Sequence, residues 1–430
     1  MQNIIYQNSY DVSPGGTHSI ARQRLFTETR GRPPIFVKWA KGSHFSDNNG
    51  NIYLDYHNAF GAILLGHAHP VVNKAIQEQL ANGSMYGLNH SKEVELCKKI
   101  IKYTPCAEMV RLLTTGSEAV TAALGIARRY LGKNKFIKFI GHYHGWHDHL
   151  VPGSSAHPDT MRWPPKGIPV SSWKETISIP WNDLDLVDQV LKRESTQIAA
   201  IITEPIMFNG PYSVFPDKKY LEELVNLAHS YNVLVIFDEI ICGFRLALGG
   251  AQEILEVIPD LTVLGKALGN GFPISAVAGK REIMECGEFI GGTYNSNPIS
   301  TAAALATLEL LERPNTYKKL YTMSKNLMNG LKDIINDLDI PAIVQGPGPA
   351  FTVSFTTNGE IEGKDYYQKY LDTKSGINQR RQEMFFEELW NQNILFRPRV
   401  CLTLSHTEKD IEETLRVAEK AFVSVNSFSQ

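Results

Sequence analysis

The sequence predicts an α/β fold with a mostly parallel sheet, together with a smaller α+β domain. Three observations lead to this fold class. From about Pro70 to Gly279, short β-branched runs alternate with amphipathic helical stretches. In these runs, the side chains that would point to either face of the sheet are apolar, as is typical of strands that helices cover on both faces. After Pro298, long helical stretches replace the alternation. A chain of 430 residues, 43% of them hydrophobic, is long enough for both domains.

The alternating region contains six expected strands and three expected helices. The strands are expected at 109–113, 136–140, 198–203, 233–238, 261–264 and 275–278. The helices are expected at 117–131, 184–192 and 217–231, with Gly132 as a C-terminal cap of the first.

The two ends of the chain have a different pattern. The first fifty residues show hairpin-like alternation at 35–39, 44–46 and 52–56. Towards the C-terminus we expect a strand at 351–355 and helices at 300–311, 317–338, 378–391 and from Thr407 onwards. We therefore expect an N-terminal segment, 1–55, that packs with a C-terminal small domain, 311–430, and a large domain between them, 56–310.

Composition argues against several classes of function. Lysine plus arginine number 43 and aspartate plus glutamate 45, for a net charge of −2, so neither nucleic acid nor a membrane surface is the expected partner. The longest apolar runs are too short to span a bilayer, and the polar start lacks the pattern of a signal peptide. Five scattered cysteines do not form a disulfide framework, which favours a reducing cytoplasm.

The segment Thr114–Ala119 follows an expected strand and opens an expected helix. Gly116 and Ser117 would present backbone N–H groups at the helix N-terminus, where the partial positive charge suits a phosphate. The alternative is an ordinary N-terminal cap at Ser117.

Asp238 and Glu239 close the apolar run 233–237. A carboxylate at a strand end can hold a protonated ring nitrogen, which makes a pyridine ring an electron sink. Taken alone, Asp238 is equally consistent with a metal ligand or a helix cap.

Lys266 follows another strand and is surrounded by glycines and apolar residues. Desolvation there would lower its pKa and free the amine for imine formation. An outward-pointing lysine in a turn is the alternative.

Four histidines stand between Gly141 and His149. Their spacing matches no closed zinc pattern, so we expect no metal, and an aromatic residue here could instead stack on a flat cofactor ring.

The order and spacing of these motifs resemble those of the class III (subgroup II) pyridoxal-phosphate (PLP)-dependent aminotransferases, and most closely the glutamate-1-semialdehyde 2,1-aminomutase branch. The resemblance covers nearly the whole chain. The matching motifs are Ser13-Pro14-Gly15-Gly16 with Ser19 and Arg22, Asp55-Tyr56, Gly66-His67-Ala68-His69-Pro70, Gly116-Ser117-Glu118-Ala119, Tyr143-His144-Gly145, Glu204-Pro205, Asp238-Glu239 with Gly243-Phe244-Arg245, Gly265-Lys266, and Gly292-Thr293 with Asn297-Pro298.

The resemblance implies fold-type I and PLP as the cofactor. It implies that Lys266 is the catalytic lysine, which binds PLP as a Schiff base and later moves protons. The other implied cofactor contacts are Gly116 and Ser117 to the phosphate, Tyr143 stacked on the ring, Asp238 at the ring nitrogen, Glu204 and Asn209 near the cofactor hydroxyl, and Thr293 reaching the phosphate of a neighbouring subunit. The last contact implies a homodimer with shared active sites.

Ser19 and Arg22 match substrate-binding positions of the aminomutase branch. Two regions depart from it. The segment 395–407 is shorter, lacks the branch's glutamate and contains Arg397 and Arg399, and the loop 152–173 is rich in proline and tryptophan instead of glycine. Arg397 and Arg399 are candidate clamps for a substrate carboxylate, or else surface arginines beside a proline turn.

These departures favour a cytoplasmic aminotransferase that moves an amino group from a donor such as glutamate to an aldehyde or ketone. Four aromatic residues, Phe60, Tyr86, Trp146 and Trp163, could line a pocket for an amino sugar or another specialised metabolite. The alternative is glutamate-1-semialdehyde 2,1-aminomutase. A non-catalytic regulatory protein that binds PLP or a metal is a remote third hypothesis.

Overall fold

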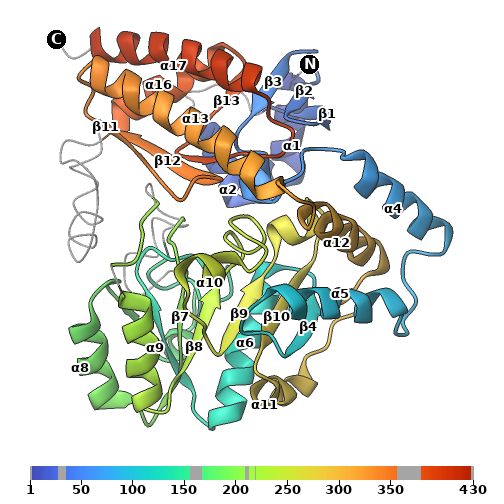
Figure 1. The fold of residues 1–430 in the computed structure, drawn as a ribbon, viewed down its shortest axis with the longest axis vertical. Coiled ribbons are helices and arrows are strands. Elements are labelled where there is room, and N and C mark those ends of the chain that lie inside the picture. The colour runs from blue at the N-terminus through green and yellow to red at the C-terminus, as the bar shows by residue number, and fades with distance from the viewer. Residues whose placement is uncertain are drawn as a thin grey trace.

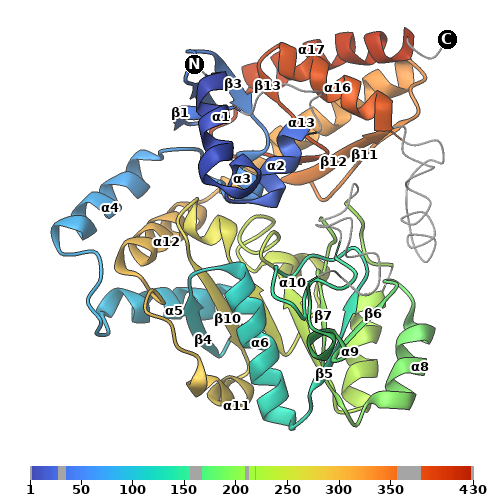
Figure 2. The same cartoon turned by 180° about the vertical axis from the view of Figure 1, so that it is seen from behind.

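The computed structural model describes residues 2–27, 35–154, 167–208, 213–217, 219–355 and 379–427. The chain forms a larger part around one sheet and a smaller part that contains both chain ends (Figures 1 and 2). The helices α4 (Pro70–Ala81) and α12 (Pro298–Leu311) lie where the two parts meet.

The larger part contains a seven-stranded sheet with the strand order β4-β10-β9-β8-β7-β5-β6. The strands from β9 to β6 run parallel, whereas β10 is antiparallel to both of its neighbours. The bounds are β4 (Met109–Leu113), β5 (Lys135–Phe139), β6 (Thr176–Ile179), β7 (Ile198–Thr203), β8 (Leu234–Asp238), β9 (Leu261–Leu264) and β10 (Ser275–Gly279). All six expected strands are present; β6, at the sheet edge, was not expected.

Helices cover both faces of this sheet, as the doubly apolar strands predict. Ile236 belongs to the cluster beneath α6 (Gly116–Leu131). Its neighbours Val235 and Phe237 belong to the cluster beneath α8 (Leu184–Glu194) and α9 (Tyr220–Ser230). The alternation of side chains along each strand therefore fills two separate cores.

The smaller part contains two short sheets. One has the order β1-β2-β3-β13 and the other β11-β12-β14. The strand β13 pairs in parallel with β3, so the N-terminal strands share a sheet with the C-terminal part. The bounds are β1 (Val37–Lys41), β2 (His44–Asp47), β3 (Ile52–Asp55), β11 (Ala342–Gln345), β12 (Ala350–Phe355), β13 (Ile394–Leu395) and β14 (Arg399–Cys401). The expected boundaries at 55 and 310 stay predictions.

Three long helices cover the small sheets: α13 (Thr316–Asp337), α16 (Gln379–Asn391) and α17 (Glu408–Ser427). The remaining helices are α1 (Gln2–Val12), η1 (Pro14–Gly16), α2 (Ile20–Thr27), α3 (Asn58–Gly61), α5 (Ser91–Tyr103), α7 (Val170–Trp173), α10 (Gly250–Leu255), η3 (Lys266–Gly269), α11 (Arg281–Met284) and η4 (Glu285–Phe289). Within the described ranges, no helix is both long enough and apolar enough to cross a bilayer.

Candidate active site

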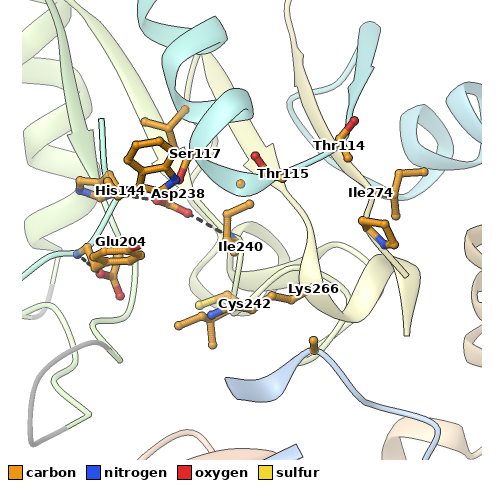
Figure 3. A pocket seen from close by; sticks show the side chains of 18 of the residues that line it. Thr114, Thr115, Ser117, His144, Glu204, Asp238, Ile240, Cys242, Lys266 and Ile274 are labelled. Carbon is orange, nitrogen blue, oxygen red and sulfur yellow. Dashed lines mark hydrogen bonds and ion pairs between the residues drawn. The ribbon is translucent and has the colours of Figure 1, made fainter. Parts of the chain in front are cut away.

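A cavity of about 400 Å³ opens at the edge of the large sheet where the parallel strands end. Its lining includes residues at the end of β8 and on the segments that follow β4, β5, β7 and β9. Ligands of open α/β sheets bind at this edge. Six residues singled out in the sequence line the cavity: Gly116, Ser117, Tyr143, Glu204, Asp238 and Lys266. Figure 3 labels four of them, Ser117, Glu204, Asp238 and Lys266.

The N-terminus of α6 forms one wall of the cavity. A reciprocal capping box holds it, because Thr115 Oγ1 accepts from the Glu118 N–H and Glu118 Oε2 accepts from the Thr115 N–H at 2.8 Å. The N-terminal cap is thus Thr115, and Gly116 and Ser117 lie in the first turn, where N–H groups have no acceptor within the helix. Gly145 has a φ of +119°, and a Cβ there would meet Ser117 Oγ at 2.6 Å, so glycine lets this loop approach the helix end.

Asp238 lies at the end of β8, beside a buried histidine. His144 Nδ1 is 2.7 Å from Asp238 Oδ2, and the Ile240 N–H donates to Oδ1 at 3.1 Å. The two side chains are 0% and 4% exposed. Figure 3 marks both contacts with dashed lines. This network fixes the orientation of a carboxylate at the cavity wall.

Glu204 follows β7 and holds the loop that carries Tyr143. Its Oε1 accepts from the Tyr143 N–H at 2.8 Å, and its Oε2 accepts from the Phe208 N–H at 3.0 Å. The Glu204 N–H in turn donates to His142 Nδ1. The Glu204 carboxylate thus links the backbone of Tyr143 to the backbone of Phe208, and this link helps to hold the Tyr143 ring at the cavity.

Lys266 begins the short helix η3 directly after β9, with a φ of +44°. Left-handed backbone is costly for a residue with a side chain, and such strain is characteristic of functional sites. Burial, and after it the positive charge of Arg399, lower the pKa of Lys266 from 10.5 to about 7. An amine with this pKa is about half unprotonated at pH 7 and can act as a nucleophile.

Two arginines of the predicted clamp lie in different surroundings. Arg397 is 5% exposed, and its guanidinium lies 5.6 Å from the centre of the Trp390 ring, so the alternative of a surface arginine is wrong for this residue. Arg397 is not among the described residues that line the cavity. Arg399 is half-buried and donates to the Phe208 carbonyl at 3.1 Å, and its charge acts on Lys266.

Three other predicted residues, Ser19, Arg22 and Thr293, are not among the described residues that line the cavity. Ser19 and Arg22 lie at the start of α2, and Thr293 is exposed on the loop before α12. Asn209 lies outside the described residues. The functional assignments of these four residues stay predictions.

The histidine cluster has a role that the sequence did not reveal. His144 binds the Asp238 carboxylate and His142 binds the Glu204 backbone. No group of three or more potential ligands that could hold a metal occurs among the described residues. The one sequence signal for these contacts was the position of both histidines after a strand at the ligand-binding edge.

The proposed aromatic substrate pocket stays a prediction. Of the described candidates, only Trp146 lines the cavity. Phe60 packs edge-on against His57, and the Tyr86 hydroxyl bonds to Asn82 and Gln79. Trp163 lies outside the described ranges. Sequence alone could not separate these residues, because aromatic side chains serve packing as readily as binding.

The chemistry of this cavity fits PLP. A helix N-terminus suits the phosphate, an amine of lowered pKa suits the aldehyde, and a fixed carboxylate suits the ring nitrogen. The aminotransferase class-III family model matches residues 26–403. A glutamate-1-semialdehyde 2,1-aminomutase of Methanothrix thermoacetophila is 40% identical, covering 96% of this chain and 94% of that protein. A second, from Methylacidiphilum infernorum, is 37% identical, covering 96% and 95%.

A solved structure gives the same result. The crystal structure of an omega-transaminase from Sphaerobacter thermophilus matches with a TM-score of 0.89 and 26% identity, covering 99% of this chain and 98% of that one. Fold-type I is thus confirmed, and the chain belongs to the class-III aminotransferase family of enzymes, with pyridoxal 5′-phosphate as its cofactor.

Proposed function

We propose that this enzyme moves an amino group within or between small substrates that carry a carboxylate, and that glutamate-1-semialdehyde 2,1-aminomutase activity is the first specific reaction to assign to it. The names of relatives 34–40% identical over nearly the whole chain support this alternative over the glutamate-dependent aminotransferase that the sequence departures favour.

The observation that carries the proposal is the placement of Lys266. Its amine, with a pKa of about 7, lies in the same cavity as Asp238 and the N-terminus of α6. When bound, PLP supplies an electron sink for the carbon next to the substrate nitrogen. We assign to Lys266 Nζ the attachment of the cofactor, and then the removal and return of a proton at the substrate carbon.

We assign to the other cavity residues the task of holding and orienting the cofactor. Asp238 is assigned to the ring nitrogen, and the N–H groups of Gly116 and Ser117 to the phosphate. Tyr143 is assigned to the face of the ring and Glu204 to the loop that carries Tyr143, through the 2.8 Å hydrogen bond from its N–H. All five residues belong to the cavity lining.

Arg399 favours a second candidate, an aminotransferase with a carboxylate donor. A guanidinium near the reactive amine can bind a carboxylate through two parallel hydrogen bonds. The omega-transaminase relative, 26% identical, also supports intermolecular transfer.

Product analysis separates the two reactions. The enzyme is incubated with glutamate-1-semialdehyde alone, and separately with glutamate and a panel of aldehydes and ketones. An aminomutase forms the isomer whose amino group has moved from C2 to C1 and releases no keto acid. An aminotransferase releases one molecule of keto acid per amino group transferred. Absence of both products, together with an unchanged cofactor absorbance, would overturn the proposal. A Lys266→Ala variant that retained full function would support the regulatory hypothesis.

We further propose a homodimer with shared active sites. Thr293 is exposed and stands away from the cavity of its own chain, so any contact with the phosphate needs a second copy. Mixing Thr293→Ala chains with Lys266→Ala chains tests this: sharing predicts that mixed dimers contain one site free of both substitutions and one site with both. Activity that mixing never restores would contradict the proposal.

A further inference from the structure

The residue after Asp238 is a second carboxylate, Glu239, which is fully buried and is not among the described residues that line the cavity. The Glu239 N–H donates to the Val263 carbonyl at 2.9 Å, so the backbone stays extended just beyond the end of β8. Successive side chains of an extended backbone point to opposite faces of a sheet, and Asp238 and Glu239 therefore leave the strand on opposite sides. Burial raises the pKa of Glu239 to about 7, so a carboxylate here is costly and needs partners.

Both oxygens of the Glu239 carboxylate accept hydrogen bonds. Oε2 accepts from the Ala251 N–H, in the first turn of α10, at 2.6 Å, and Oε1 accepts from Nε2 of the Gln252 amide at 2.7 Å. Gly250 has a φ of +66°, and a Cβ at this position would clash with Glu239 Oε2. The start of α10 is thus shaped around the carboxylate.

The orientation of the Gln252 amide is set by a third segment. Its Oε1 accepts from the Cys106 N–H at 3.0 Å, in the loop before β4. Because a backbone N–H only donates, the oxygen of Gln252 faces Cys106 and its NH2 group faces Glu239. This row of hydrogen bonds therefore requires two acceptor oxygens at the end of the Glu239 side chain.

The backbone connects this row to Asp238. The Ile240 N–H donates to Asp238 Oδ1 at 3.1 Å (Figure 3). The Glu239 carbonyl, which accepts from the Gly243 N–H at 2.8 Å, belongs to the same planar peptide unit as that N–H. The orientation of one peptide thus decides how its N–H meets the Asp238 carboxylate.

We propose that Glu239 is a positioning residue for Asp238: the grip of α10 and Gln252 on its side chain fixes the peptide that donates to Asp238 Oδ1. The inference rests on the proposed role of Asp238 at the cofactor ring nitrogen. A hydrogen bond weakens steeply as its angle closes, so a rotated peptide would release one oxygen of Asp238 and turn the carboxylate away from its place at the cavity. The other oxygen keeps its contact with His144.

The first test variant is Glu239→Gln, which keeps the size of the side chain and replaces one acceptor oxygen with an NH2 group. Whichever way the new amide is turned, its NH2 group faces a donor, either the Ala251 N–H or the Gln252 NH2 group. Turning Gln252 over only moves the conflict to the Cys106 N–H. Two buried donors that face each other are unfavourable, because neither has an acceptor.

The second variant combines Glu239→Gln with Gln252→Glu and so exchanges the two side chains. The carboxylate at position 252 then accepts from the Cys106 N–H and from the amide at position 239. The oxygen of that amide accepts from the Ala251 N–H. All three hydrogen bonds are restored, and the exchanged pair should therefore rescue the single variant.

Glu253→Gln is the matched control. Glu253 is exposed on the same helix and accepts from the Gly249 N–H at 2.8 Å, a bond that an amide oxygen can also make. For each variant, the dissociation constant of PLP and the urea midpoint of the cofactor-free protein are measured at pH 8. We expect Glu239→Gln to raise the dissociation constant about tenfold and to lower the midpoint. The exchanged pair and Glu253→Gln should bind PLP within about twofold of the wild type.

A double-mutant cycle separates positioning of Asp238 from a general structural role. Asp238→Asn alone should weaken PLP binding at least about tenfold, and Glu239→Gln added to it should weaken binding less than about twofold further, because the group that Glu239 positions is already lost. An equal tenfold effect of Glu239→Gln in both backgrounds would overturn the inference. So would PLP binding like that of the wild type in a folded Glu239→Gln protein.

If Glu239→Gln does not fold, the exchanged pair decides. A folded exchanged pair with the PLP affinity of the wild type supports the inference, and loss of folding or tenfold weaker binding overturns it. An error in the role of Asp238 gives a different result: Asp238→Asn then binds PLP as tightly as the wild type, which removes that role and the inference with it.

Discussion

Replacing Lys266 by methionine removes a half-buried group that can carry a positive charge, while keeping a side chain of similar length. The pKa of Lys266 falls from 10.5 to about 7, mainly because of burial. At 1.36 kcal/mol per tenfold change, this corresponds to at most about 5 kcal/mol of destabilisation when the amine is protonated. Lys266 is only half-buried and faces an open cavity, so solvent reduces the value to about 2 kcal/mol.

The sign of the pH dependence follows from proton binding. Below pH 7 the lysine is protonated in both the folded and the unfolded chain, and the folded state bears the full cost. Between about pH 7 and 10.5 only the unfolded chain holds the proton, so the free energy of unfolding of the wild type rises with pH. We therefore expect Lys266→Met to be more stable than the wild type at pH 6.5, and the difference to shrink towards pH 9.5.

The assay is urea unfolding of cofactor-free wild type and variant at these two pH values. Lys74, whose side chain is 78% exposed, provides the control Lys74→Met, which should change the free energy of unfolding by less than about 0.5 kcal/mol at both. A difference between Lys266→Met and the wild type that stays constant with pH, or grows, would refute the lowered pKa and with it the proposed nucleophile.

Three further substitutions give distinct outcomes. Asp238→Asn should lower kcat at least about 100-fold while the fold stays intact by circular dichroism, because an amide holds a cationic nitrogen poorly; activity near wild type would contradict this role. Arg399→Gln should raise KM for a carboxylate donor about 10- to 100-fold and leave an amine without a carboxylate nearly unaffected; equal losses would exclude a clamp. Arg245→Met should lower stability by about 3–5 kcal/mol in thermal melts, since the Arg245 guanidinium donates to four buried carbonyls, at Gly61, Ile63, Pro349 and Leu402; a loss below 1 kcal/mol would show that water replaces these bonds.

The strands that sequence predicted and the strand it missed differ in burial. Every residue of β7 is buried, and so is every residue of β8. Such continuous apolar runs are strong signals. The missed strand β6 lies at the sheet edge, and its two central residues are only half-buried. The sequence of β10 also does not show that this strand is antiparallel, because the direction of a strand is defined only relative to the strands beside it, here β4 and β9.

The pair Arg397 and Arg399 illustrates a second limit of sequence. Two residues apart and chemically identical, they were equivalent candidates for a carboxylate clamp. Tertiary packing placed Arg397 over the Trp390 ring, and it placed the charge of Arg399 where it lowers the pKa of Lys266. No local pattern distinguishes the two surroundings.

Sequence by itself determined the fold class, the family and the cofactor, because strand periodicity and the order of motifs are local properties of the chain. Which side chains meet was decided only by the tertiary structure. His144 and Asp238 are 94 positions apart, yet lie 2.7 Å from each other because β5 and β8 end at the same edge of the sheet. The histidines that resembled a metal cluster are instead directed at a carboxylate and a backbone N–H, since only packing fixes where a ring nitrogen points.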